Sequence, residues 1–247
     1  MLIKHEEILI KNPKNKKTYC EIFSYQPENI EEISLGNLYV VSELTSEENS
    51  SRLTNLLNSV IKREFYFSPH RGSLTSMENS LKKVNYLLNE MANQDNLSWL
   101  GHLHFICAVF NKQDLYLSQA GQAQAWLCRE GSLTNITKKI VPAPQKPHPA
   151  KIFQSVISGK VELDDKFIFG TPLFFNLFND KGFEQILTLP KLEMIFHQIS
   201  QVLHEQKKPP SLGALIIEMA PDEEEISKKN NNKFITPPIG LSEILNP

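Results

Sequence analysis

Cysteine is scarce in this chain, and its scarcity excludes two classes of small stabilised domain. The sequence has three cysteines in 247 residues, namely Cys20, Cys107 and Cys128. An odd number of widely separated cysteines does not form a disulfide framework or a structural zinc site. Two of the three lie inside apolar stretches. We therefore expect buried thiols in a reducing compartment, which places the protein in the cytoplasm.

The chain also lacks a large excess of positive or negative charge. The formal net charge is −2, whereas a nucleic-acid-binding domain normally carries a basic patch. One small basic cluster occurs at residues 14–17, where Lys-Asn-Lys-Lys follows a proline. We interpret it as a solvated hairpin turn, so we expect no nucleic-acid partner.

Long apolar runs are missing as well. A membrane-spanning helix needs about 20 consecutive apolar residues, and no stretch approaches that length. The N-terminus also lacks the apolar segment of a signal peptide. We expect no membrane span in this chain. The hydrophobic fraction of 40% is instead enough for the core of one large domain or two small ones.

The pattern of apolar residues predicts strands and helices in a mixed order. Alternating or apolar segments predict strands at 2–10, 18–25 and 38–41, with the third strand ending at Ser42-Glu43-Leu44. Stripes with helical spacing predict helices that begin near Thr45 and Thr75, each with a glutamate three residues on, and another at 189–205. Further strands are expected at 152–157, 166–169 and 212–219, and a short helix at 174–178.

Residues 103–137 form the most regular stretch of the chain. Four short strands are predicted there, at 103–110, 115–119, 123–128 and 133–137. The breaks between them are short and contain Asn111, Gly121 and Gly131, which favour turns. We expect the four strands to form an up-and-down antiparallel meander.

The third of these strands carries a resemblance to a known family. It is entered through Gly121-Gln122-Ala123-Gln124, where the metal-dependent serine/threonine protein phosphatases of the PPM type (type 2C) have Gly-Asp-Ser-Arg. The order of elements resembles that family over roughly residues 18–220. The resemblance implies an α+β fold, a four-layer αββα sandwich of two antiparallel sheets flanked by helix pairs. We expect this domain to span 1–220, and 221–247 to be a flexible tail or linker.

The resemblance also shows what the chain lacks, because the metal ligands of the family are aspartates. A strand ending in Asp-Gly in the family reads Glu43-Leu44 here. The Ser-Asp-Gly motif reads Thr171-Pro172-Leu173, and the last Asp-Asn motif reads Pro210-Ser211. With Gln122, the degenerate metal-site positions are therefore Glu43, Gln122, Pro172 and Pro210. One carboxylate cannot hold two hard cations against their hydration.

A loss of ligands on a retained fold predicts a pseudophosphatase, with no catalytic residues and no cofactor, that serves a regulatory or protein-interaction role. We expect an unidentified protein partner and a cleft filled near Leu44, Gln122, Pro172 and Phe174. The alternative is a divergent Mn²⁺- or Mg²⁺-dependent phosphoprotein phosphatase that uses Glu43, helped by Asp165 or a histidine. Whether the chain is an enzyme at all is therefore left open, and we favour the inactive interpretation.

Several other signals have a functional and a plain interpretation. His102 and His104 share one face of a strand and could bind zinc, but no third ligand is close in sequence. Glu43 could be a general base, or an exposed carboxylate that leads a helix. Residues 68–73 could hold a phosphate, although a helix cap is the simpler interpretation. The apolar cluster at 174–178 is a contact patch if exposed, and fills the vacated metal site if buried.

Overall fold

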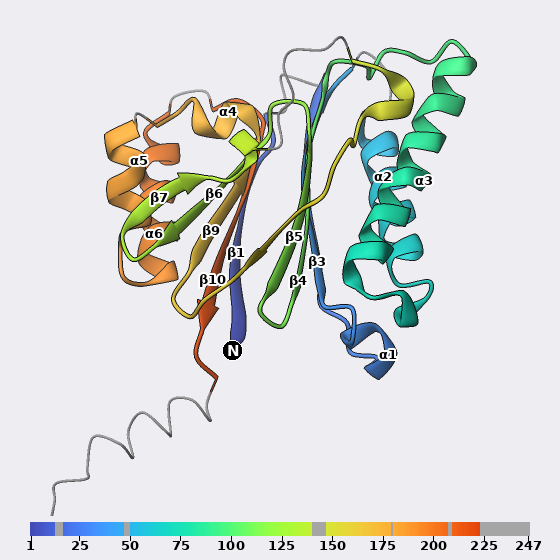
Figure 1. Ribbon diagram of the computed structural model, residues 1–247. Helices are drawn as coiled ribbons and strands as arrows, with labels where there is room; N and C mark the ends of the chain where they lie inside the picture. The colour runs from blue at the N-terminus through green and yellow to red at the C-terminus, as the bar shows by residue number, and fades with distance from the viewer. Residues whose placement is uncertain (13–16, 47–49, 140–146, 179, 207–208, 223–247) are drawn as a thin grey trace, which may run out of the picture.

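Two five-stranded antiparallel sheets lie face to face, with helices on both outer faces (Figure 1). This is a computed structural model, which describes residues 1–12, 17–46, 50–139, 147–178, 180–206 and 209–222. The sheet that we call sheet A has the order β1-β10-β9-β6-β7, and sheet B has the order β2-β3-β4-β5-β8. The strands of sheet A are β1 (Leu2–Ile10), β10 (Leu212–Ala220), β9 (Lys166–Gly170), β6 (Gln124–Arg129) and β7 (Ser132–Asn135). Those of sheet B are β2 (Thr18–Tyr25), β3 (Asn37–Thr45), β4 (Leu103–Asn111), β5 (Asp114–Ala120) and β8 (Ile157–Lys160).

The helices divide between the two outer faces. A long pair covers sheet B, and a group of shorter helices covers sheet A (Figure 1). The helices on sheet B are α2 (Ser50–Phe65) and α3 (Ser73–Asn93). Those on sheet A are α4 (Pro172–Phe175), α5 (Asp180–Leu187) and α6 (Leu192–His204). The remaining helical turns are α1 (Ile30–Ile33), η1 (Pro69–Arg71), η2 (Thr137–Lys139) and η3 (Pro149–Lys151).

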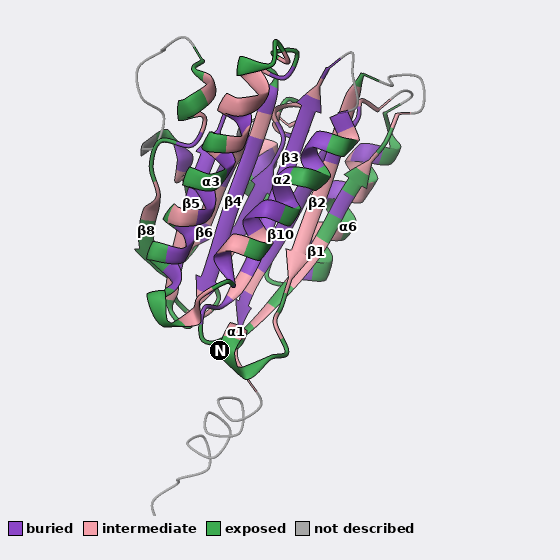
Figure 2. Ribbon diagram, turned by 90° about the vertical axis from the view of Figure 1, so that its right-hand side faces the viewer, coloured by how far each residue is buried: buried purple, intermediate pink, exposed green. Residues whose placement is uncertain are grey.

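Alternation along the strands separates the core into three layers. On β3, for example, Val41 points between the two sheets, while Val40 points toward α2 and α3. Successive side chains of a strand point to opposite faces, so a strand that is buried on both faces reads as almost continuously apolar. Figure 2 shows this directly, because β3 and β4 are buried along most of their length whereas β1, at an edge, is not. The α+β, four-layer αββα prediction is confirmed.

The predicted connections between strands were wrong in two places. β1 and β2 do not form a hairpin: β1 pairs with β10 and β2 pairs with β3, in different sheets. Most of the basic cluster at 14–17 lies outside the described residues. The predicted four-strand meander is also divided, because β4 and β5 belong to sheet B and β6 and β7 to sheet A. Short turns are compatible with either arrangement, and inter-sheet packing decides between them.

Gly121 makes the crossing between the sheets. Its φ is +65°, and a Cβ there would lie 2.3 Å from the Leu103 carbonyl oxygen and 2.4 Å from His104 Nδ1. Both contacts are far below van der Waals separation, so only glycine fits. The chain therefore leaves sheet B and enters sheet A at this residue.

Several predicted boundaries also differ. β3 continues through Glu43 to Thr45, so Thr45 is a strand residue and does not cap a helix. Helix α3 begins two residues before Thr75, after Gly72, with no side-chain cap. The segment 25–33 contains the helical turn α1, whose Asn29 side chain accepts a hydrogen bond from the Glu31 backbone N–H. The strand predicted at 152–157 begins only at Ile157.

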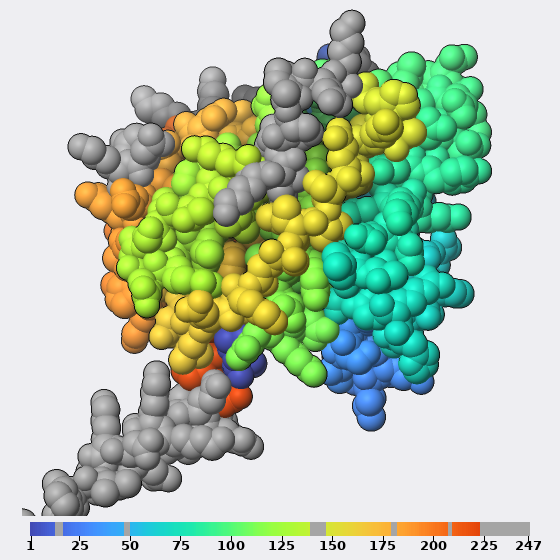
Figure 3. Space-filling view, viewed as in Figure 1, coloured from blue at the N-terminus to red at the C-terminus, as the bar shows by residue number. Residues whose placement is uncertain are grey.

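The segment before β9 crosses the side of the molecule. Residues 147–165 run from η3, which lies against α3, past β8 to the start of β9 (Figure 3). Asn85 of α3 holds this segment twice, since its amide nitrogen donates to the Phe153 carbonyl and its oxygen accepts from the Phe153 N–H. Of the helices in the described ranges, none combines the length and apolar character that crossing a bilayer requires.

Candidate functional site

Glu43 lies inside the molecule, on the face of β3 between the two sheets. It is 4% exposed and shares that face with Tyr39 and Val41. Our interpretation of Glu43 as an exposed carboxylate leading a helix was therefore wrong. Burial raises the pKa of Glu43 to about 7, and a hydrogen bond from the Thr171 hydroxyl only partly opposes this. Its Oε2 atom has no hydrogen-bond partner, which favours the neutral acid.

His104 lies directly opposite Glu43 on the neighbouring strand β4. Directly opposite residues of an antiparallel pair point to the same face. The Nδ1 atom of His104 accepts a hydrogen bond of 3.0 Å from the backbone N–H of Gln122. Desolvation lowers the pKa of His104, and His102 adds to this. The ring is therefore held neutral, with its proton on Nε2.

Thr171 closes the site from the other sheet. It follows β9 and precedes α4, and its backbone N–H donates to the Gly213 carbonyl at 2.9 Å. Its hydroxyl accepts from the Gly213 N–H at 3.3 Å and hydrogen-bonds Glu43. Thr171 is completely buried. The adjacent Pro172 occupies the first turn of α4, where a proline is tolerated because the N–H would be unpaired.

Three of the four sequence-predicted positions meet at this end of the sandwich. Glu43 lies opposite His104, whose Nδ1 binds the Gln122 N–H, and it hydrogen-bonds Thr171, the residue before Pro172. Pro210 lies two residues before the start of β10, in the segment that Asn12 holds by hydrogen bonds to the Pro209 carbonyl and the Ser211 hydroxyl. The sequence did not point to Thr171 as a site residue, because Thr171 entered the comparison only as the neighbour of Pro172, the predicted metal-site position.

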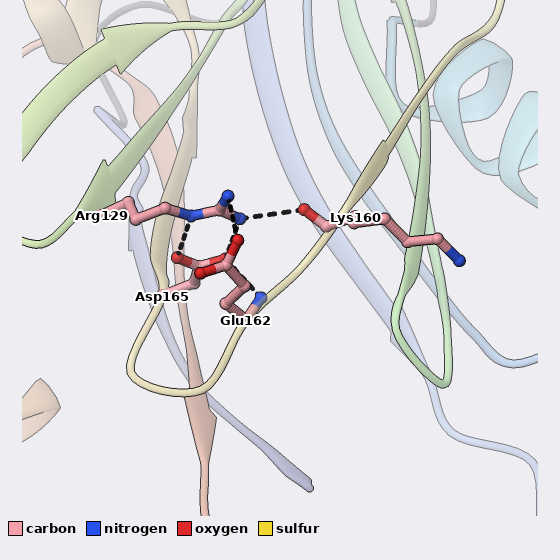
Figure 4. Close-up of polar contacts among 4 residues, drawn as sticks. All are labelled: Arg129, Lys160, Glu162 and Asp165. Carbon is pink, nitrogen blue, oxygen red and sulfur yellow. Dashed lines mark hydrogen bonds and ion pairs between the residues drawn. The ribbon is translucent and has the colours of Figure 1, made fainter.

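Asp165 does not belong to this site. It lies at the opposite end of β9, and the five residues of that strand span roughly 17 Å. Arg129 donates two hydrogen bonds, of 2.8 and 2.7 Å, to its carboxylate. The same guanidinium also donates to Glu162 and to the Lys160 carbonyl (Figure 4). Asp165 therefore ties β6 to the β8–β9 connection. It cannot assist Glu43, which was one of the two possibilities in the alternative interpretation, the other being a histidine.

Of the residues expected to fill the cleft, Gln122 is exposed and Pro172 is half-buried, whereas Leu44 and Phe174 are buried in other layers. Leu44 is fully buried, but it points toward α2 and α3. Phe174 is also fully buried, in the layer under α5 and α6. The space between the sheets near Glu43 is instead approached by Thr171 and Ile22, since a Cβ on Gly213 would lie 3.7 and 3.6 Å from them.

The side chains at these positions do not fit a pair of divalent cations. Hard cations need several oxygen ligands each, and the four positions supply the single carboxylate of Glu43. Within the described ranges, no group of three or more His, Cys, Asp or Glu side chains is placed to hold a metal ion. His102 and His104 therefore have no third ligand there. No reaction step through a metal follows from these residues.

Comparison with known proteins identifies the fold. No family model matches the sequence, and no curated protein matches it. Solved structures do match. The catalytic domain of the serine/threonine phosphatase PstP, in complex with two manganese ions, has a TM-score of 0.66 and 11% identity over 89% of this chain and 99% of that chain. PppA of Pseudomonas aeruginosa, described as a key regulatory component of T6SS, has a TM-score of 0.61 and 12% identity over 88% and 98%.

A third match names the family in full. The PPM Ser-Thr phosphatase MsPP of Mycobacterium smegmatis, in complex with cacodylate, has a TM-score of 0.59 and 10% identity over 88% of this chain and 98% of that chain. The chain therefore has the fold of PPM-type serine/threonine phosphatases, and the fold implied by the sequence resemblance is confirmed.

One expectation must be corrected. We expected this chain to use no cofactor, but PstP, which shares its fold, holds two manganese ions. A protein whose whole domain has this architecture can therefore bind metal ions, and the expectation is withdrawn.

Proposed function

We propose that this chain is a PPM phosphatase-like domain without phosphatase activity, which serves a regulatory or protein-interaction role. The observation that carries the proposal is the state of Glu43. The residue that matches the metal-bridging aspartate of the resemblance is buried, opposite a neutral histidine, with Thr171 closing it from the other sheet. A carboxyl group in that state is not an exposed metal ligand.

The neighbouring positions add no chemistry that could replace it. Gln122 is exposed and neutral, and its backbone N–H is engaged by His104. Pro172 and Pro210 have no side-chain donor or acceptor. Attack on a phosphoester requires an activated water and stabilisation of the developing charge. The described side chains of this end supply neither, which supports an inactive domain.

The regulatory part of the proposal is supported by the fold. PppA, which has the same architecture, is described as a regulatory component. On this proposal the packed layers serve to present a surface to a partner, since the fold by itself does not imply catalysis. The free, buried cysteines suit a reducing compartment, and we include a cytoplasmic location in the proposal. We also propose that the folded domain ends near residue 220, with a tail beyond it.

A phosphatase assay tests the proposal. The purified chain is incubated with p-nitrophenyl phosphate and with a phosphothreonine peptide, in buffers containing millimolar Mn²⁺ or Mg²⁺. The catalytic domain of PstP serves as the positive control. We expect no turnover above the buffer rate from the chain or from Glu43→Ala. Metal-dependent turnover that is lost in Glu43→Ala would overturn the proposal and establish the divergent phosphatase.

A further inference from the structure

A pocket lies on the outer face of sheet A, away from Glu43. It has a volume of about 540 Å³ and is walled by aromatic rings from β6, α4 and α5 and by polar groups at its rim. Figure 1 shows α4 and α5 beside the β6–β7 hairpin that completes the pocket. The lining residues are Gln124, Trp126, Leu133, Phe175, Asn176, Phe178, Phe183 and Glu184.

The aromatic wall is a connected and ordered cluster. The ring of Phe183 contacts Trp126, Phe175 and Phe178, with centroid distances of 5.7, 5.4 and 5.8 Å. Phe183 is buried, whereas the other three rings are half-buried. The indole N–H of Trp126 donates to Gln124 Oε1 at 3.0 Å, and Asn135 donates to the same oxygen at 3.1 Å. Because Trp126 is held by its N–H edge, its ring is fixed before any ligand arrives.

The rim of the pocket has negative charge and no positive charge among its described lining residues. Glu184 is exposed, and within the described ranges its carboxylate has no hydrogen-bond or ion-pair partner. The Asn176 side chain is likewise exposed and has no described partner. An unpaired carboxylate beside four aromatic rings attracts a cation, since ring faces and carboxylate are both electronegative.

We propose that this pocket binds an arginine side chain of a partner protein. A guanidinium is planar, stacks on aromatic faces and presents several N–H donors in a fixed fork. It can therefore stack on the aromatic wall while its edge donates to the carboxylate of Glu184 and the amide oxygen of Asn176. A lysine ammonium is more strongly hydrated and offers no plane for stacking, so the pocket favours arginine over lysine.

This inference deepens the proposed interaction role and rests on it, because it states what part of a partner the domain contacts. It does not involve the Glu43 site. Trp126 points away from the inter-sheet layer and packs with the residues under α5 and α6, whereas Glu43 faces the space between the sheets. The two sites can therefore be tested on one sample with separate readouts.

The two tryptophans of the chain allow a direct test. In a ¹⁵N-labelled sample each gives one indole N–H resonance. Trp126 lies in the pocket, and Trp99, which is 1% exposed in the core under α2 and α3, is an internal control. N-acetyl-arginine-N-methylamide is titrated into the chain. Its neutral isostere, the citrulline derivative, and the lysine derivative are titrated into parallel samples.

We expect the arginine probe to shift the Trp126 resonance saturably without moving that of Trp99. The citrulline probe should bind about tenfold more weakly, because it cannot form a charged hydrogen bond with Glu184. Glu184→Gln should weaken the arginine probe by about the same factor. The matched control, Glu193→Gln on the exposed first turn of α6, should leave binding unchanged.

The outcomes separate clearly. An unshifted Trp126, or equal binding of the citrulline probe, overturns the site. Equal binding of the lysine probe overturns the assignment to arginine. A phosphatase assay on the same sample reports on the other proposal: turnover with arginine binding intact refutes the inactive domain alone, and absent binding in an inactive chain refutes the pocket alone.

Discussion

The side chains of Glu43 and His104 lie directly opposite each other on β3 and β4, in the space between the two sheets. Burial raises the pKa of Glu43 to about 7 and lowers that of His104. A raised pKa favours the neutral form of an acid and a lowered pKa favours the neutral form of a base, so both shifts favour the uncharged form. This end of the sandwich therefore disfavours charge on both groups, unlike an exposed carboxylate cluster.

The state of Glu43 predicts a pH dependence of stability. The folded pKa is about 7 and the unfolded one about 4.3, so between these values the folded protein binds more protons than the unfolded protein. The free energy of unfolding therefore falls as pH rises through this window, by up to roughly 4 kcal/mol. Glu43→Gln should remove this fall. Urea unfolding at pH 5, 6, 7 and 8 measures it.

His104 acts in the opposite direction, since a lowered histidine pKa makes the folded state less stable as pH falls. The quantity to compare is therefore the free energy of unfolding of wild type and of Glu43→Gln at each pH. Relative to wild type, the variant should become more stable toward pH 8. Glu193→Gln, at an exposed position, should follow the wild-type curve. A pH-independent difference for Glu43→Gln would contradict the assigned state.

Gly121→Ala should destabilise the domain strongly. The new Cβ would lie 2.3 Å from the Leu103 carbonyl oxygen, at a φ of +65°. The left-handed backbone alone costs roughly 1–2 kcal/mol, and the clash with main-chain atoms adds to it. The matched control is Gly131→Ala, at φ +76° with nothing within 4 Å, which should lose only about 1 kcal/mol. Equal losses in chemical unfolding would refute the packing argument.

Asp165→Ala should cost roughly 2 kcal/mol of unfolding free energy, because it removes the hydrogen bonds of a buried carboxylate to Arg129 and leaves the Glu162 backbone N–H without its acceptor. Asp165 is 1% exposed and binds both Arg129 and the Glu162 backbone N–H. Glu162 contacts the same arginine, but its side chain is 59% exposed. Glu162→Ala should therefore change stability by less than about 1 kcal/mol. A comparable loss in both variants would show that Asp165 has no special role.

The three cysteines should be unreactive in the folded protein. All are free and buried, and desolvation raises the pKa of Cys107 to about 12, so almost no thiolate exists at neutral pH. Ellman's reagent should label none of them at pH 7.5 in native buffer and three after denaturation in urea. Rapid labelling of one thiol without denaturant would show that the strand carrying it opens locally.

The sequence by itself determined the layered fold. Alternation and near-continuous apolar runs predict buried strands, and the stripes of α2, α3 and α6 predict helices that must cover a sheet. It also predicts, through the resemblance, that Glu43, Gln122, Pro172 and Pro210 stand at the positions of an aspartate cluster. A match to the fold follows from that order of elements, although no family model and no curated protein matches the sequence.

Tertiary structure decided the rest. Whether a short turn keeps the chain in one sheet or passes it to the other depends on inter-sheet packing, as at Gly121. The burial of Glu43, its hydrogen bond with Thr171 and its place opposite His104 bring together residues more than 60 positions apart. The aromatic pocket likewise unites Trp126 with Phe175 and Phe183. Local secondary-structure propensity contains no information on such long-range contacts, because they form only when the four layers pack together.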